Sequence, residues 1–171
     1  SKEFKKIGLD GAEIISADSR QIYKFLDIGT AKPNAEELKK IKHHFIDILN
    51  PEQDYNAAEF GQQARVKIEE LLQDGKQAVI VGGSGLYIKA LIDGFFEGPG
   101  KNPEIREQLE DEVNRFGADF LYEKLKTVDS VSASKMDATK VRRIIRALEV
   151  FYTTGQPISA HHQTQNSKPP F

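Results

Sequence analysis

The chain has 171 residues, a formal net charge of −2 and 39% hydrophobic residues, a balance typical of a globular protein. This charge excludes a generally basic, histone-like mode of nucleic-acid binding but leaves room for a local basic patch. Because there is no cysteine, disulfides, thiolate zinc sites, iron–sulfur clusters and thiol catalysis are excluded. No apolar run approaches the roughly 20 residues that a membrane span needs, so we expect no membrane partner.

Short apolar runs alternate with helical patterns through the first hundred residues. This alternation is typical of an α/β fold with a parallel sheet, and such sheets bind ligands beyond the carboxyl ends of their strands. Asp18 and Ser84 lie at the carboxyl ends of two of the expected strands. The expected strands are residues 12–16, 45–49 and 78–81, and the expected helices are the end of one at residues 1–10 and those at residues 34–41, 56–73 and 86–92.

The second part of the chain has no strand pattern. Asn102-Pro103 predicts a helix start, with a capping residue before a first-turn proline, and Thr139 can cap a later helix that ends at Gly155. Apolar residues at helical spacing predict helices from about residue 103 to 116, from 120 to 125 and after Thr139. We therefore expect a partial α/β core at residues 1–97, a helical unit at residues 98–156 and a polar connection without a core at residues 157–171.

Asp18-Ser19-Arg20-Gln21 is the first segment that could carry chemistry. A carboxylate at the end of a buried strand can accept a proton, hold Mg²⁺ through water, or cap the next turn as an Asx turn. The four residues match no general motif, so both the chemical and the structural interpretation stay open.

The turn Gly82-Gly83-Ser84-Gly85 is the second such segment. Glycines between a strand and a helix allow the backbone to approach an anion at the helix N-terminus. The spacing fits neither of the two common phosphate-binding glycine motifs, and a plain tight turn explains it equally well.

Three arginines lie opposite the apolar face of the last long helix: Arg142, Arg143 and Arg146, with Glu149 three residues further on. They form either a solvated face with an Arg–Glu pair or a contact surface for a phosphate backbone. The adjacent pairs His43-His44 and His161-His162 have no acidic partners at metal-ligand spacing, so they are predicted to be structural or surface histidines.

Four segments, in this order and spacing, resemble the signatures of the tRNA dimethylallyltransferases, the isopentenyl-pyrophosphate transferases that modify tRNA. Each segment alone has low specificity, but together they identify the chain from about Ala12 to Pro157 as a member of this family. The segments are Ile14–Tyr23 (IISADSRQIY), Asp27–Pro33 (DIGTAKP), Val81–Tyr87 (VGGSGLY) and Arg142–Glu149 (RRIIRALE).

The resemblance implies a P-loop NTPase-like α/β core interrupted by an all-helical insertion that contacts tRNA. It also implies the reaction, which transfers a dimethylallyl group from dimethylallyl diphosphate to the exocyclic amine of an adenosine beside the anticodon. Diphosphate leaves with the assistance of Mg²⁺, whose protein ligands are unknown. The implied partners are the tRNA anticodon stem-loop and dimethylallyl diphosphate, and we expect a monomer in the cytoplasm, or in an organelle.

The resemblance assigns roles to particular residues. Asp18 is the implied catalytic residue, because its carboxylate can take or orient the proton of the adenine amine. Ser84 is implied to lie at the mouth of a channel that receives the extruded adenosine. The residues implied to bind tRNA are Asp18, Ser19, Arg20, Gln21, Ser84, Arg106, Arg142, Arg143, Ile144, Ile145 and Arg146.

The family pattern is incomplete in this chain. The diphosphate-binding P-loop is expected immediately before Ser1, and a further strand after Phe171, so we expect an internal fragment that is inactive alone. Met136–Thr139 also departs from the family's usual residues before the arginine helix. Two other classes stay open: a nucleotide or small-molecule phosphotransferase, which would bind a nucleoside triphosphate, and a non-catalytic RNA-binding module, in which Asp18 would be dispensable.

Overall fold

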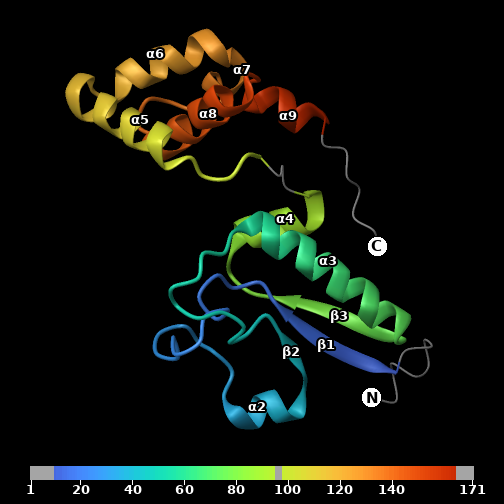
Figure 1. The fold of residues 1–171 in the computed structure, drawn as a ribbon. Coiled ribbons are helices and arrows are strands. Elements are labelled where there is room, and N and C mark those ends of the chain that lie inside the picture. Colours follow the sequence, from blue (N-terminus) through green and yellow to red (C-terminus); the bar gives the residue numbers. More distant parts are fainter. Residues whose placement is uncertain (1–9, 95–97, 165–171) are drawn as a thin grey trace. The chain divides into compact units, whose positions relative to one another are not determined.

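Three parallel strands in the order β2–β1–β3 form the sheet of the first unit in the computed structural model (Figure 1). The structure describes residues 10–94 and 98–164, which belong to two separate units. Strand β1, Gly11–Ser16, pairs along its whole length with β3, Lys76–Val81. Strand β2, His43–His44, is short and lies on the other side of β1. The expected parallel α/β fold is therefore confirmed.

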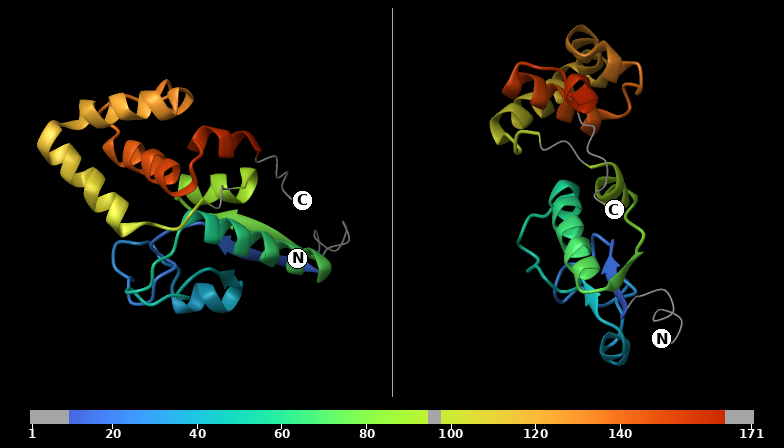
Figure 2. Two further views of the ribbon diagram at one scale, coloured as in Figure 1. Left: turned by 45° about the horizontal axis from the view of Figure 1, so that its top comes forward. Right: turned by 90° about the vertical axis from the view of Figure 1, so that its right-hand side faces the viewer.

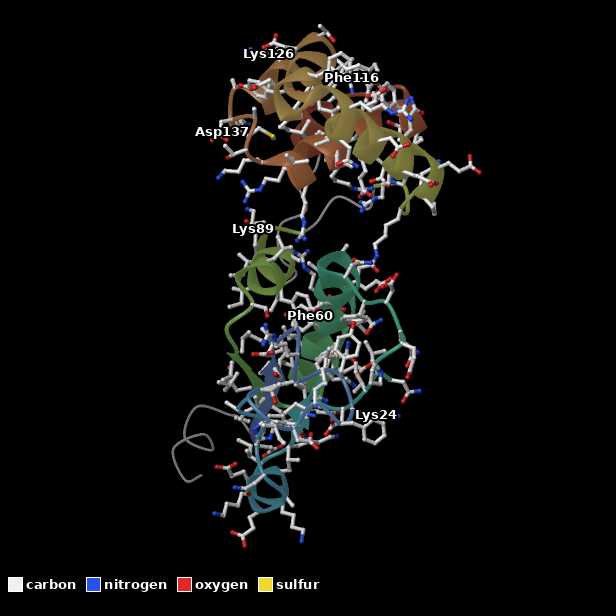
Figure 3. The ribbon with its side chains drawn as sticks, turned by 90° about the vertical axis from the view of Figure 1, so that its left-hand side faces the viewer. Lys24, Phe60, Lys89, Phe116, Lys126 and Asp137 are labelled. Atoms are coloured by element: carbon white, nitrogen blue, oxygen red, sulfur yellow. The ribbon has the colours of Figure 1, made fainter. Side chains whose placement is uncertain are left out.

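Two helices cover one face of this sheet: α3, Ala57–Gln73, and α4, Gly85–Asp93 (Figures 1 and 2). Phe60 of α3 is fully buried between them and the strands (Figure 3). Its ring stacks on Tyr87 of α4, with the ring centroids 4.5 Å apart. Aromatic burial of this kind supplies a large part of the stability of a small core. The two helices thereby hold the carboxyl ends of β1 and β3 in place.

The predicted strand at residues 45–49 is wrong. Strand β2 ends at His44 because Phe45 and Asp47 adopt left-handed backbone angles, with φ of 64° and 54°. The apolar run is instead a loop, whose N–H groups at Asp47 and Ile48 donate to the carbonyl oxygens of Gln21 and Ile22 over 3.1 and 2.9 Å. The alternation of apolar residues indicates a segment that packs on its neighbours, but it does not show that the segment forms the hydrogen-bond ladder of a strand.

The second unit is entirely helical within residues 98–164. Its core joins apolar side chains from four helices, and the most buried of them include Leu125, Ile144 and Leu148. As predicted, the Asn102 side chain caps the first helix, with Pro103 at its first position. The helices are α5, Pro103–Phe116; α6, Ala118–Val128; α7, Ser130–Ala133; α8, Val141–Thr154; and α9, Ile158–Thr164.

Two expectations for this unit are corrected. Thr139 does not cap α8, because its N–H and hydroxyl groups bind the Asp137 carboxylate and Lys140 takes the capping position. Residues 158–164 form α9 rather than a connection without a core. Ile158 packs against the helical core, and the N–H of Ser159 donates to the buried carboxylate of Asp129 over 3.0 Å.

The helix end expected at residues 1–10 lies outside the described residues, apart from Asp10. Among the helices that the structure does describe, none is long and apolar enough to cross a membrane.

Candidate functional site

The carboxyl ends of β1 and β3 are joined through two serines. The Ser84 hydroxyl accepts the N–H of Ser19 over 2.8 Å and donates to the Ser19 hydroxyl over 3.1 Å. The N–H of Ser84 donates to the carbonyl of Ala17 over 3.1 Å. Because its hydroxyl is used in this way, Ser84 gives α4 no side-chain cap. Two predicted site segments, 65 residues apart in the chain, therefore lie side by side.

Asp18 uses one of its two carboxylate oxygens to shape the turn after β1. Its Oδ1 accepts the N–H groups of Arg20, over 2.8 Å, and Gln21, over 3.2 Å. Its Oδ2 accepts no hydrogen bond from residues 10–94 or 98–164. The Asx-turn interpretation therefore holds for one oxygen, while the other remains available to a ligand.

A glycine allows the two strand ends to approach this closely. Gly82 has a φ of 154°, and a Cβ atom placed on it would lie 2.3 Å from the carbonyl oxygen of Ala17. Any larger residue would force apart the backbones that carry Asp18 and Ser84.

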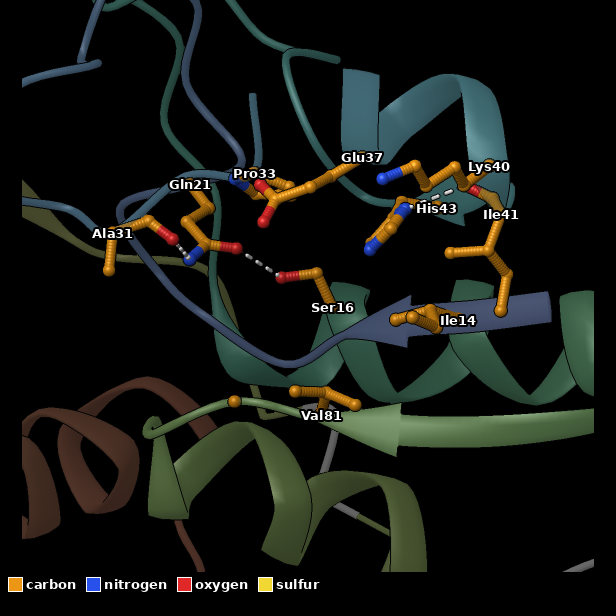
Figure 4. Close-up of a pocket in the computed structure, with 11 residues that line it drawn as sticks. Ile14, Ser16, Gln21, Ala31, Pro33, Glu37, Lys40, Ile41, His43 and Val81 are labelled. Atoms are coloured by element: carbon orange, nitrogen blue, oxygen red, sulfur yellow. Dashed lines mark hydrogen bonds between the residues drawn. The ribbon is translucent and has the colours of Figure 1, made fainter. Parts of the chain in front are cut away.

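Gln21 lies beside a pocket of about 430 Å³ on the sheet face that carries Ile14 (Figure 4). Its amide oxygen accepts the Ser16 hydroxyl, and its amide nitrogen donates to the carbonyl oxygens of Thr30 and Ala31. The side chain of Gln21 is thus occupied in holding the following loop. Helix α2, Ala35–Lys40, contributes Glu37 and Lys40 to the pocket; the other lining residues are Ala31, Pro33, Ile41, His43, Val81 and Gly82.

A buried lysine fixes the segment between β1 and α2. The ammonium of Lys32, whose side chain is 6% exposed, donates to the Tyr23 carbonyl over 3.0 Å and to Asp27 and Asp47 over 2.7 Å each. Burial alone would lower the pKa of Lys32, but the two carboxylates raise it. Phe25 keeps a strained backbone, with φ of 68°, within the segment that this ammonium holds.

The histidines of β2 are structural, as predicted. His44 contacts the carboxylate of Glu13 over 2.6 Å, and Glu13 also accepts Lys76 of β3 over 2.7 Å, so one buried carboxylate ties all three strands together. His43 contacts the Ile41 carbonyl over 2.9 Å. Among the described residues, no group of three or more His, Cys, Asp or Glu side chains could hold a metal ion.

In the helical unit, Glu149 forms a buried cluster with two of the predicted arginines. Its side chain is 0% exposed. Its Oε1 accepts Arg106 Nε over 2.7 Å and the Asn102 N–H over 2.7 Å, and its Oε2 accepts Arg106 Nη2 over 2.9 Å and Arg146 Nη1 over 2.7 Å. Sequence reasoning noted an Arg146–Glu149 pair but missed the partner 43 residues away in α5.

This cluster makes part of the stability dependent on acid. Burial would raise the pKa of Glu149, but hydrogen bonds from the two arginines and the Asn102 N–H lower it from 4.5 to about 2. The stabilisation, on the order of 3 kcal/mol, is complete above about pH 5 and is lost as the pH falls from 4.5 towards 2. The free energy of unfolding should therefore differ more between the unaltered chain and Glu149→Gln at pH 6 than at pH 3. Urea unfolding at the two pH values measures this, and an equal difference would contradict it.

The other predicted residues of α8 divide into exposed and buried ones. Arg142 and Arg143 are exposed, so they can meet a large polyanion. Ile144 and Ile145 are 0% and 6% exposed, and their side chains belong to the helical core. The predicted tRNA contact is therefore not retained for these two side chains, because an amphipathic helix turns its apolar positions inward.

Comparison with known proteins gives consistent results. The family model described as IPP transferase matches residues 21–171. The chain is 48% identical over 160 residues to the tRNA dimethylallyltransferase of Chloroherpeton thalassium, covering 94% of this chain and 50% of that protein. The enzyme of the same name from Aquifex aeolicus is 46% identical over 159 residues, covering 93% and 52%. The chain thus spans about half the length of the curated relatives that it matches.

Solved structures resemble the chain as well. A full-length tRNA isopentenylpyrophosphate transferase from Bacillus halodurans is 40% identical, with a TM-score of 0.50 over 85% of this chain and 48% of that one. A eukaryotic dimethylallyltransferase, described as acting on tRNA, is 26% identical, with a TM-score of 0.76 over 99% of this chain and 41% of that one. On the family match, the sequence identity and the shared fold, this chain belongs to the IPP transferase family.

Proposed function

We propose that this chain forms part of an enzyme that transfers a dimethylallyl group from dimethylallyl diphosphate to the exocyclic amine of an adenosine next to the tRNA anticodon. Membership of the IPP transferase family supports the reaction class. The observation that carries the proposal is the Asp18 carboxylate at the carboxyl end of β1, whose Oδ1 holds the turn while its Oδ2 accepts no hydrogen bond from the residues that the structure describes. Open α/β sheets bind their ligands at this edge.

In this proposal the adenine nitrogen attacks the first carbon of the dimethylallyl group. A nitrogen–carbon bond forms, the carbon–oxygen bond to diphosphate breaks, and the amine loses one proton. Asp18 Oδ2 accepts that proton or orients the amine, while Oδ1 continues to hold the turn. The Ser84 hydroxyl, fixed by Ser19, contacts the nucleotide that enters the site.

Mg²⁺ is proposed as the cofactor that neutralises the departing diphosphate. Magnesium commonly keeps most of its waters and uses only one or two carboxylates. Its charge would stabilise the departing diphosphate when bound. Asp18 Oδ2 and the Ser84 hydroxyl are assigned in this proposal to the adenine amine and the nucleotide, and no group of three or more His, Cys, Asp or Glu side chains among the described residues could hold a metal ion, so neither residue is assigned to the ion.

The arginines of α8 are proposed to contact the backbone of the anticodon stem-loop. Arg142 and Arg143 are exposed and are therefore the arginines of this helix most accessible to RNA. Replacing both by alanine should weaken tRNA binding. It should also reduce the slope of log binding constant against log salt concentration by about one to two units, because fewer phosphates are neutralised and fewer counterions are released on binding.

Fluorescence anisotropy across a salt titration measures this effect. The matched control replaces Arg115 and Lys126 by alanine, because it removes the same charge from exposed positions on α5 and α6. An unchanged slope for Arg142→Ala/Arg143→Ala would assign these arginines to a solvated face.

The proposed reaction is tested with the chain completed to the full length of its relatives. Incubation with labelled dimethylallyl diphosphate and unmodified tRNA should place the label on an adenosine beside the anticodon. Label transferred instead from a nucleoside triphosphate would favour a phosphotransferase. RNA binding without transfer of either label would favour a non-catalytic module.

A further inference from the structure

The buried carboxylate of Glu149 is fully saturated by donors from three places in the helical unit. Four hydrogen bonds of 2.7 to 2.9 Å reach its two oxygens, from Asn102, Arg106 and Arg146. Arg146 Nη2 also donates to the carbonyl of Pro99 over 2.9 Å. The two arginine side chains are therefore fixed from several directions.

The side chains of the same two arginines remain partly exposed to solvent. Each side chain is 33% exposed although both meet a carboxylate that is 0% exposed. Neither the Arg106 Nη1 group nor the Arg146 Nε group hydrogen-bonds to any described residue. Besides Glu149, the carboxylate of Glu110 also interacts electrostatically with Arg106. The cluster thus combines fixed geometry with donors that no described residue uses.

We infer that Glu149 is a positioning residue, which holds Arg106 and Arg146 side by side as one preformed receptor for a phosphate of the RNA backbone. The inference rests on the proposed function in that RNA is the ligand. A planar guanidinium suits phosphate because its donors lie in a fixed fork. Arginine side chains that are already ordered lose less conformational freedom on binding than mobile surface lysines do.

Electrostatics alone and positioning predict opposite effects for Glu149→Gln. Removing a negative charge beside a polyanion site should tighten RNA binding if only the net charge matters. If Glu149 positions the arginines, the amide releases them, and binding of a synthetic anticodon stem-loop RNA should weaken about fivefold to tenfold. The measurement is fluorescence anisotropy at a temperature at which circular dichroism shows both proteins to be folded.

Glu112→Gln provides a matched control. It removes a charge from another partly buried ion pair of the helical unit, to Lys124 over 2.7 Å, away from the two arginines. We expect its RNA affinity to be unchanged or slightly higher. A loss equal to that of Glu149→Gln would show a general effect of destabilising the unit and would overturn the inference.

A double-variant cycle separates positioning from a purely structural role. In an Arg106→Ala/Arg146→Ala background, Glu149→Gln should cause no further loss of RNA affinity, because the residues through which it acts are gone. An additional loss of the same size would overturn the inference. If the unaltered chain binds no RNA, the proposed function fails first; if it binds RNA and Glu149→Gln binds equally or more tightly, only the positioning role fails.

Discussion

Asp18→Ala is expected to slow dimethylallyl transfer by about 10²–10⁴-fold, the usual cost of losing a general base, in the protein completed to the length of its relatives. The affinity for tRNA should change little, since Asp18 is one of several proposed contacts and the arginines of α8 are untouched. Single-turnover rates with labelled dimethylallyl diphosphate, together with tRNA binding curves, measure the two effects separately.

Asp18→Asn is the control that decides between the two roles of this side chain. An asparagine oxygen can still accept the N–H groups of Arg20 and Gln21, so the turn after β1 should persist. Its amide cannot take a proton from the adenine amine. Turnover as slow as that of Asp18→Ala would support the proton-accepting role, whereas turnover near the unaltered rate would leave Asp18 with the turn alone.

Gly82→Ala should destabilise the first unit by about 3 kcal/mol or more. The added Cβ would lie 2.3 Å from the Ala17 carbonyl oxygen and 2.4 Å from its carbon, and both are backbone atoms that cannot rotate away. The φ of 154° is also unfavourable for alanine. Overpacking of this kind typically costs about 1–3 kcal/mol before the backbone strain is added.

Gly83→Ala is the matched control for this substitution. Among the described residues, and apart from its chain neighbours, no heavy atom lies within 4 Å of the position that an added Cβ would take on this glycine, and its φ is not left-handed. The free energy of unfolding should therefore change by less than about 0.5 kcal/mol. Urea unfolding of the two variants measures the difference. Equal stability of both variants would contradict the close approach of β1 and β3.

The α/β part could be predicted from local patterns where burial and spacing agree. The β1 and β3 runs and the α3 helix combine apolar periodicity with clear end signals, such as Asn56, whose side chain accepts the N–H groups of Ala58 and Glu59. The turn at Asp18 was also visible, because Asx turns depend on residues two and three positions ahead. Features that depend only on residues close together in the chain can therefore be predicted from the sequence.

Two features could not be predicted from local patterns, because they depend on contacts between distant parts of the chain. These are the loop at residues 45–49, where a strand is expected, and the role of Glu149. Phe45 leaves the strand conformation because the loop pairs with Gln21 and Ile22, more than twenty residues earlier. Arg106 approaches Glu149 only because α5 packs on α8. A polar residue at a buried helix position was the available signal, since Glu149 follows the apolar Leu148 and precedes Val150.

The three bonds of the Lys32 ammonium determine how the segment between β1 and α2 exchanges its amide hydrogens. A connection without a ladder normally opens piecemeal and exchanges quickly. Here Tyr23, Asp27 and Asp47 share the three protons of one buried cation, so none of the three can move away without leaving that charge underbonded. The segment should therefore open as one cooperative unit. The protection of its amides from exchange should depend on the Lys32 contacts rather than on the stability of the sheet.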